Sequence, residues 1–282
     1  MNIVTSTAVV RDMVQNVAGP RDVITALMGP GTDPHLYPPL SRELPLLLHA
    51  DLVFIVGLML EPSLVKAEDE DRSERIDLKS VAGGIRGIEL LGCPTTGRAD
   101  PHVWFDIPLW AERVDSVAWH LSRRFPVHAA EYAASAERYR ARLMELHAWV
   151  RAQVARVPPQ RRVLVTAHDA FGYLGRAYGF RVRGLQGVHT TALASTEAEV
   201  QALAEFVVRD RVPVVFTETS VGTGGLERVQ RAARERGWDV RVAGPLYSDA
   251  MGKRDTPHGT YEGMMRHNVD TIVGALLADG EG

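Results

Sequence analysis

Short apolar runs alternate with amphipathic segments along most of the chain, and this alternation predicts an α/β fold. The apolar runs that predict strands are residues 3–7, 23–28, 52–56, 85–91, 163–166, 180–185, 212–217 and 240–243. The segments whose apolar spacing or end signals predict helices are residues 9–17, 41–50, 106–124, 168–179, 196–209, 225–237 and 261–277. Strands that alternate with helices form parallel sheets, and ligand-binding loops follow the carboxyl ends of such strands.

The longest amphipathic segment lies near the middle of the chain, at residues 129–157. Its larger apolar side chains, with one alanine among them, recur every three or four positions, at Tyr132, Ala136, Tyr139, Leu143, Leu146, Val150, Val154 and Val157. Pro126 precedes the segment and Pro158 ends it, because proline cannot continue a helical hydrogen-bond ladder. At ~1.5 Å per residue this helix is roughly 40 Å long, about the width of a lobe. We interpret it as a rigid strut between two lobes, although one more helix inside a single domain would give the same pattern.

The expected architecture is therefore two parallel-sheet lobes joined by one long backbone helix. The expected boundaries are a first α/β lobe at residues 1–126, the linker helix at residues 127–158 and a second α/β lobe at residues 159–282. A chain of this length can bury a core in each lobe. The two lobes follow a similar plan but show no close sequence repeat.

Composition and charge argue against several classes of protein. The net charge of −3 and the isoelectric point near 6.4 argue against a nucleic-acid-binding surface, which needs clustered positive charge. No apolar run approaches the ~20 residues of a membrane-spanning helix. The start of the chain leads directly into a predicted strand, so we expect that an export signal is absent from this chain. Cys93 is the single cysteine, which excludes an internal disulfide and a cysteine-rich metal site.

Four side chains near the ends of predicted strands are of types that bind transition metals. They are His35, His102, His168 and Asp249, two from each half of the chain. His35 and His102 each stand in an Asp-Pro-His sequence, where proline stiffens the backbone beside the imidazole. Three neutral imidazoles and one carboxylate form a set that zinc accepts, and carboxylate oxygens also suit manganese.

Each of these histidines, taken singly, has a simpler interpretation as a loop residue hydrogen-bonded to backbone. Composition alone does not select them over the remaining histidines, which are His49, His120, His128, His147, His189, His258 and His267. Those on charge-rich helical segments, at positions 120, 128 and 147, are expected to face solvent. His267 is expected to be structural, and His189 and His258, in loops near the rim of the expected cleft, are not expected to be ligands.

Two acidic features carry further expectations. Residues 61–77 are strongly charged, and we expect this segment to face solvent. Glu218 ends a predicted strand that points toward the expected cleft. We favour a role for Glu218 as a cap of the following loop over a role behind the metal ligands or as a spare oxygen ligand.

Several segments resemble those of the metal-binding solute receptors of ABC importers, in particular the TroA-like zinc and manganese receptors. They follow one another over nearly the whole chain, as GPGTDPHLYPP, ADLVFIVGLMLE, DPHVWFDIPLW, VLVTAHDAFGYLGRAYGF, GLQGV, LYSDAMG and GTYEGMMRHNVDTIVGAL. The resemblance implies two α/β lobes joined by one long helix, with the metal bound between the lobes. Carried onto this chain, it implies the ligands His35, His102, His168 and Asp249. Some relatives thought to prefer manganese have Glu at the third position, where this chain has His168.

The function that this resemblance implies is capture of a divalent zinc or manganese ion and its delivery to the membrane permease of an ABC transporter. We expect a monomer in the periplasm or at the outer face of the cytoplasmic membrane, which is not an enzyme and binds no nucleic acid. The alternatives are a mononuclear metal-dependent hydrolase, which would keep an open coordination position for water, and a surface adhesin, whose partner binding would survive the loss of His102. Because histidines must be neutral to bind metal, the affinity for the metal ion is expected to fall as the pH drops through the ordinary histidine pKa of about 6.5.

Overall fold

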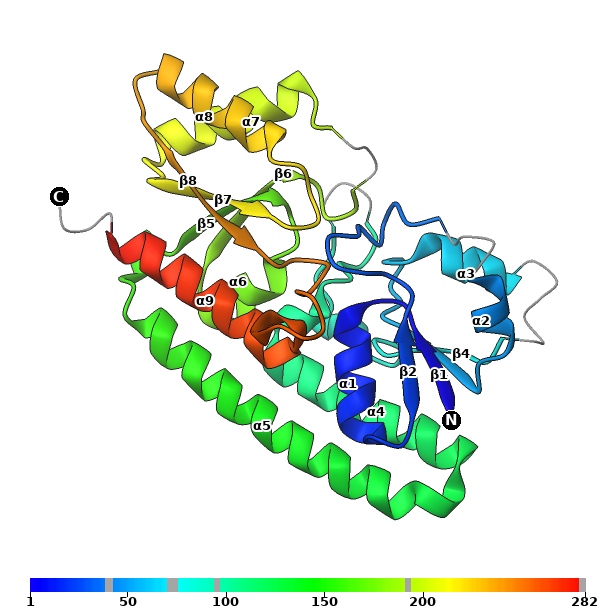
Figure 1. Ribbon diagram of the computed structural model, residues 1–282. Helices are drawn as coiled ribbons and strands as arrows, with labels where there is room; N and C mark the ends of the chain where they lie inside the picture. Colours follow the sequence, from blue (N-terminus) through cyan, green and yellow to red (C-terminus); the bar gives the residue numbers. More distant parts are fainter. Residues whose placement is uncertain (39–42, 70–75, 94–96, 191–193, 279–282) are drawn as a thin grey trace.

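Two lobes stand on one long helix in the computed structural model (Figure 1). The structure describes residues 1–38, 43–69, 76–93, 97–190 and 194–278. Within this part of the chain each lobe contains a four-stranded sheet in which all strands are parallel. The expected α/β architecture, with two parallel-sheet lobes and a connecting helix, is confirmed.

The two sheets have the same connectivity. The first has the strand order β2-β1-β3-β4 and the second the order β6-β5-β7-β8, so each lobe places its first strand between its second and third. The bounds of the strands are β1 Asn2–Thr5, β2 Val23–Ala26, β3 Leu52–Ile55, β4 Leu78–Ser80, β5 Val163–His168, β6 Arg181–Gln186, β7 Val214–Glu218 and β8 Arg241–Leu246. The lobes therefore repeat a topology without repeating a sequence.

Helices flank both sheets and form the connection between them. Their bounds are α1 Ala8–Ala18, α2 Leu44–Leu48, α3 Pro62–Asp69, α4 Ile107–Arg124, α5 Ala129–Ala155, α6 Gly172–Tyr178, α7 Glu197–Arg209, α8 Gly224–Glu235 and α9 Tyr261–Ala278. Short 3-10 turns are η1 Gly87–Glu89, η2 Val103–Phe105, η3 Pro126–His128, η4 Pro159–Arg161 and η5 Pro257–Gly259. Two of the expected helix starts have the expected chemistry, because Asp106 caps α4 and Thr196 forms a capping box with Glu199 at α7.

The strands divide their side chains between an inner and two outer cores, as the alternation of a pleated strand requires. In β5, Leu164 packs into the inner core, whereas Val165 packs with α7 and α8 into the outer core of the second lobe. In β1, Ile3 faces the inner core and Val4 faces the outer core of the first lobe. The inner core is continuous between the lobes and contains side chains of α1, α4, α5, α6 and α9.

Helix α5 lies beneath both lobes and closes this shared core (Figure 1). The predicted apolar stripe is buried at every position, from Tyr132 to Val157. Helix α4 packs along it from the first lobe and α9 from the second. The lobes are thus joined by packed side chains as well as by the covalent connection, which favours a stiff cleft.

Two sequence-based expectations about the first lobe were wrong, and one strand was not foreseen. The strand expected at residues 85–91 is absent from the described residues there, where Gly87–Glu89 forms a 3-10 turn. Strand β4, Leu78–Ser80, was missed because it is a short, half-buried edge strand without an apolar run. Glu61, expected to face solvent, is 1% exposed and accepts hydrogen bonds from the backbone N–H groups of Val56 and Gly57. The helix start expected at residue 41 lies outside the described residues.

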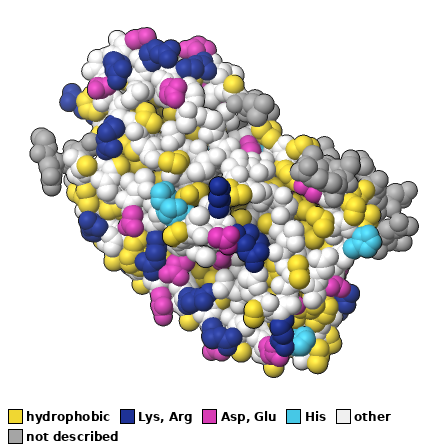
Figure 2. All heavy atoms as spheres, viewed as in Figure 1, with side chains coloured by type: hydrophobic (Ala, Val, Ile, Leu, Met, Phe, Trp, Pro, Cys, Tyr) yellow, Lys and Arg dark blue, Asp and Glu magenta, His cyan; other side chains and the backbone are white. Residues whose placement is uncertain are grey.

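Charged side chains of both signs are interspersed over the face shown in Figure 2. No large area of one sign is visible on this face. This distribution agrees with the interleaving of arginines with acidic residues along the sequence.

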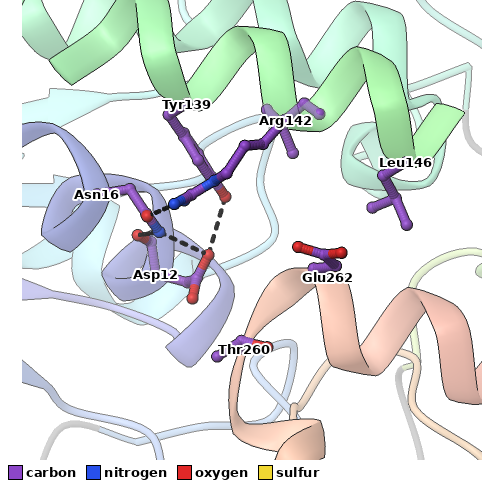
Figure 3. A pocket seen from close by; sticks show the side chains of 8 residues that line it. Asp12, Asn16, Tyr139, Arg142, Leu146, Thr260 and Glu262 are labelled. Atoms are coloured by element: carbon purple, nitrogen blue, oxygen red, sulfur yellow. Dashed lines mark hydrogen bonds between the residues drawn. The ribbon is translucent and has the colours of Figure 1, made fainter.

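A polar pocket of about 240 Å³ lies where α1, α5 and α9 meet (Figure 3). Its central group is Asp12 of α1, whose Oδ2 accepts hydrogen bonds from Tyr139 Oη of α5 at 2.8 Å and from Asn16 Nδ2 at 3.2 Å. Burial raises the pKa of Asp12, and the hydrogen bond from Tyr139 opposes that rise. The Asp12–Tyr139 bond therefore fixes the first lobe to the connecting helix.

Replacement of Tyr139 by phenylalanine is expected to lower the free energy of unfolding by about 1–2 kcal/mol, because the carboxylate of Asp12 loses a donor. Urea denaturation monitored by circular dichroism measures this change. The matched control is Tyr132→Phe on the same helix, because the hydroxyl of Tyr132 contacts only the sulfur of Met1, at 3.5 Å, among the hydrogen bonds of the described residues. Equal destabilisation by the two substitutions would contradict the stabilising role of the Asp12–Tyr139 bond.

Candidate metal centre

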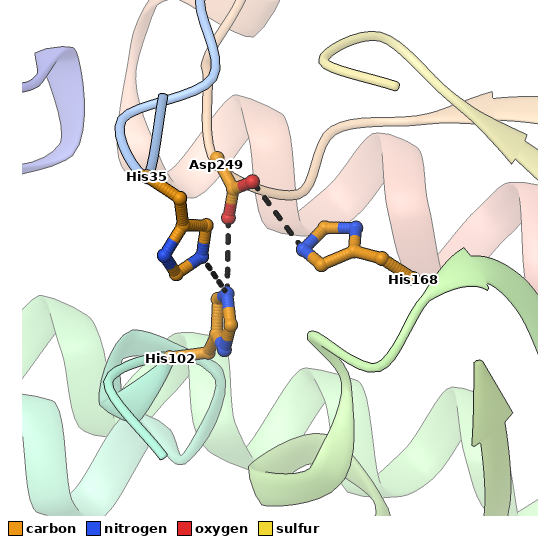
Figure 4. A group of neighbouring side chains, drawn as sticks. All are labelled: His35, His102, His168 and Asp249. Carbon is orange, nitrogen blue, oxygen red and sulfur yellow. Dashed lines mark hydrogen bonds and ion pairs between the residues drawn. The ribbon is translucent and has the colours of Figure 1, made fainter. Parts of the chain in front are cut away.

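Four side chains from loops and strand ends of the two lobes converge at one buried point (Figure 4). His35 lies in the loop after β2, His102 immediately precedes η2, His168 ends β5 and Asp249 follows β8. Their exposed fractions are 8%, 0%, 0% and 2%. Each offers a ligand atom, and these atoms all lie within 4.8 Å of one another. The structure thus brings together the four residues that the sequence resemblance singled out.

The closest contacts within this group join nitrogen and oxygen atoms that face one another. His35 Nε2 is 3.4 Å from His102 Nε2, and His102 Nε2 is 3.2 Å from Asp249 Oδ1. His168 Nε2 is 3.3 Å from Asp249 Oδ2. Four atoms bonded at ~2.0–2.1 Å to a tetrahedral zinc ion would be roughly 3.3–3.4 Å apart along each edge. These three separations are close to that spacing.

The two Asp-Pro-His sequences fold in the same way. Asp33 Oδ1 accepts the backbone N–H of His35 at 2.9 Å, and Asp100 Oδ1 accepts the backbone N–H of His102 at 2.9 Å. Such bonds two residues along the chain are Asx turns, which Asp forms readily. Asp100 Oδ1 also lies 2.7 Å from His102 Nδ1, which directs Nε2 of that ring toward the other three residues. The aspartate of each motif therefore orients its histidine, a role that the sequence analysis did not assign.

Glu218, at the end of β7, supports His168 in a comparable way. Its Oε1 accepts the backbone N–H of His168 at 2.8 Å, and its Oε2 lies 2.6 Å from His168 Nδ1. Both side chains are fully buried. A carboxylate behind an imidazole fixes the ring orientation and makes the outer nitrogen a better ligand. These contacts correct the expectation that Glu218 caps the following loop.

Burial and charge act differently on the two histidines of the first lobe. Burial lowers the pKa of His35 to about 3, so that its imidazole is neutral. Burial also acts to lower the pKa of His102, but the carboxylates of Asp100 and Asp249 outweigh it and raise the pKa of His102 to about 9. His102 therefore carries a proton near neutral pH when no cation replaces it.

The side chains of the second lobe form a coupled pair. Burial acts to lower the pKa of His168, but the carboxylates of Glu218 and Asp249 raise it well above the ordinary histidine value. Burial acts to raise the pKa of Asp249, but the charges of His168 and His102 hold it well below the ordinary aspartate value. Asp249 is therefore ionised, and its charge is balanced by the two protonated rings.

Several buried polar atoms of this group lack a hydrogen-bond partner within the described residues. Among them are both carboxylate oxygens of Asp249 and the Nε2 atom of His168, the atoms that face the centre of the group. Their separations of 3.2–3.3 Å from one another or from His102 exceed the ~2.7–2.9 Å of strong charge-assisted hydrogen bonds. An unsatisfied buried polar group costs about 1–3 kcal/mol. A divalent cation bound at this point would satisfy all of these atoms, and three imidazoles with one carboxylate are ligands that zinc or manganese accepts.

The other histidines lie outside this group. His120, His128 and His147 lie on helix surfaces and are half-buried, because each packs against an aromatic ring. His267 contacts the backbone instead: its Nε2 lies 3.0 Å from the carbonyl oxygen of Pro245. The ring of His189 contacts that of His35, with 5.4 Å between the two ring centroids.

Two parallel-sheet lobes on a shared helical core, with buried side chains that could hold a metal ion between them, form the architecture of a two-lobed metal receptor. The family model described as "ZnuA: Zinc-uptake complex component A periplasmic" matches residues 3–275. The chain belongs to this family of metal-binding solute receptors of ABC transporters.

Individual relatives agree with this assignment. The chain is 40% identical to the manganese-binding lipoprotein MntA of Bacillus subtilis, over 98% of this chain and 90% of the relative. It is 40% identical to the zinc-binding protein TroA of Treponema pallidum, over 97% of this chain and 88% of the relative. The solved structure of that periplasmic zinc-binding protein superposes on this chain with a TM-score of 0.92. The superposition covers 97% of this chain and 98% of the solved chain. None of the helices in the described residues is both long and apolar enough to span a membrane.

Proposed function

We propose that the protein captures one divalent transition metal ion, zinc or manganese, and delivers it to the membrane permease of an ABC transporter. The proposed ligands are His35, His102, His168 and Asp249. The observation that carries this proposal is the convergence of four buried ligand atoms from both lobes within 4.8 Å. The names of the relatives, one zinc-binding and one manganese-binding, support either ion as the substrate.

We further propose that residues 1–126 and 159–282 act as the two binding lobes, with residues 127–158 as the linker. Because each lobe supplies two ligands, part of the free energy of ion binding would stabilise the contact between the lobes. One of the relatives above is named as a periplasmic protein and another as a lipoprotein. These names support a location in the periplasm or at the outer face of the cytoplasmic membrane. Four protein ligands would leave no open tetrahedral position for an activated water molecule, and the relatives are named as metal-binding proteins, so we propose a receptor, not an enzyme.

Delivery is tested by uptake of radioactive zinc and manganese in cells of the source organism. Cells whose chromosomal copy carries Asp249→Asn are expected to accumulate the transported ion at a small fraction of the normal rate at limiting metal. Cells carrying Glu227→Gln, an exposed substitution on α8, serve as the control. Undiminished uptake by the Asp249→Asn cells would contradict the proposal, and a metal-dependent hydrolysis lost in the purified variant would favour an enzyme instead.

Replacement of Glu218 by glutamine is expected to weaken ion affinity by about 10–100-fold, as loss of a partner behind a metal-binding histidine commonly does. Glutamine can still accept the backbone N–H of His168 but no longer supplies the charge beside Nδ1. Isothermal titration of the purified protein measures the affinity, again with Glu227→Gln as the control. An affinity equal to that of the native protein would show that Glu218 does not support a ligand.

A further inference from the structure

A fifth imidazole stands at the edge of the proposed metal site. His189 lies in the loop after β6, in the second lobe, and its ring centroid is 5.4 Å from that of His35. The centroid of His35 is also 5.4 Å from that of His102. His102 is fully buried, His35 is 8% exposed and His189 is only half-buried. Exposure therefore falls from His189 through His35 to His102, and the ring of His35 contacts both of the others.

The two ring nitrogens of His189 have different environments. The ring lies beside the backbone of Ala99, in the first lobe. Its Nε2 atom is buried and has no hydrogen-bond partner among the described residues. A histidine that ligates a metal typically donates one ring N–H to a carbonyl or carboxylate and directs the lone pair of the other nitrogen at the ion. The unpartnered Nε2 of His189 is a nitrogen of the second kind, and Nδ1 of His102 makes the first kind of contact, 2.7 Å from Asp100 Oδ1.

The neighbouring residue fixes the loop of His189 across the cleft. Thr190 is 4% exposed, and its hydroxyl donates to Asp33 Oδ2 at 2.6 Å. The other oxygen of Asp33 accepts the backbone N–H of His35 at 2.9 Å. His189 and His35 are thus held beside each other through one shared carboxylate, although they belong to different lobes.

His189 does not belong to the final set of ligands. The four ligand atoms that lie within 4.8 Å of one another come from His35, His102, His168 and Asp249. An ion at the centre of those four would already have a complete tetrahedral shell. The free Nε2 of His189 therefore requires a different role.

We propose that His189 is a transient ligand, which together with His35 holds the incoming ion before the buried residues bind it. This inference rests on the proposed function. During uptake the ion would exchange water molecules for the two outer imidazoles, and then exchange His189 for His102, His168 and Asp249. During release the same steps would run in reverse. A ligand that acts only between the free and the bound states changes the rates in both directions and leaves the equilibrium unchanged.

The test is stopped-flow measurement of zinc binding and release with a protein that contains residues 1–282. Zinc chloride is the probe, and the fluorescence of Trp104, whose ring centroid is 5.3 Å from that of His102, is the signal. His189→Ala is expected to slow association and dissociation each by on the order of tenfold. Its equilibrium Kd is expected to stay within about twofold of the native value. His49→Ala, an exposed histidine of the first lobe, is the control and should change neither rate.

Two further variants separate ligation from packing. His189→Asn retains a polar side chain but is a poor zinc ligand, and it should be as slow as His189→Ala. His189→Cys supplies a thiolate, which zinc binds well, and it should restore both rates to within about threefold of the native rates. It also keeps the test usable if the alanine variant folds poorly.

The outcomes distinguish this inference from the proposed function. Native rates in both His189→Ala and His189→Asn would overturn it, and so would a Kd that rises in step with faster dissociation. If Asp249→Asn still bound zinc with native affinity, the proposed function itself would fail. Loss of binding in Asp249→Asn with native rates in the His189 variants would overturn the role of His189 alone.

Discussion

Replacement of His102 by alanine is expected to weaken zinc binding by more than about 100-fold, because loss of a direct ligand should exceed the 10–100-fold effect of losing a partner behind one. His102 contacts two other members of the group, with His35 Nε2 at 3.4 Å and Asp249 Oδ1 at 3.2 Å from its Nε2. It is also completely buried, so that a water molecule has little access to replace it. Competition titration against a chelator of known affinity measures the loss.

Two controls accompany the His102 variant. His49→Ala removes an exposed imidazole of the same lobe and should leave zinc affinity within about twofold. Asp249→Asn conserves side-chain volume and should also weaken binding strongly, which separates loss of a ligand from a cavity effect. Circular dichroism shows whether each variant is folded. Native affinity in folded His102→Ala protein would exclude His102 as a ligand.

Zinc binding is expected to release more than one proton per ion at pH 7 and about one proton or more at pH 8. In the metal-free protein the pKa of His102 is raised to about 9 and that of His168 lies well above its ordinary value. Both rings must lose a proton before they bind an ion, whereas the pKa of His35, lowered to about 3, leaves that ring already neutral. Affinity should therefore rise with pH by up to about 100-fold per unit near neutrality, and this rise should begin to level off near the pKa of His102.

Calorimetric titration in buffers of different ionisation enthalpy measures the number of protons released. If both rings had the ordinary histidine pKa of about 6.5, zinc binding at pH 8 would release almost no protons. The carboxylates of Asp100, Asp249 and Glu218 are the reason for the higher range. An absence of proton release at pH 8 would contradict the charged pairing described for the metal-free site.

The sequence predicted the parts of the fold that depend on local periodicity. The stripe of α5 and the N-cap at Asp106 are properties of adjacent residues, and both are confirmed. Strand β4 was missed because its pairing with β3, rather than an apolar run, makes it a strand. Glu61 was expected to face solvent because its neighbours along the chain are charged. Its carboxylate instead accepts hydrogen bonds from backbone N–H groups just after β3.

The candidate site was predicted only in part, and family resemblance was needed to select its residues. Ten histidines occur in the chain, and periodicity does not distinguish those that converge. The supporting contacts depend on tertiary structure: Glu218 and His168 are 50 positions apart, and their contact follows from the placement of β7 beside β5. The Asx bonds of Asp33 and Asp100 could have been inferred from the repeated Asp-Pro-His sequence, because Asp commonly bonds the backbone two residues later.

The position of the bound ion is the most direct test of the central claim. Anomalous diffraction from a crystal soaked with zinc locates it independently of any assumption about ligands. We expect one strong peak bonded to His35, His102, His168 and Asp249 at the ~2.0–2.2 Å typical of zinc with nitrogen and carboxylate ligands. A peak elsewhere in the molecule, or four side chains that turn away from one another around it, would contradict the account.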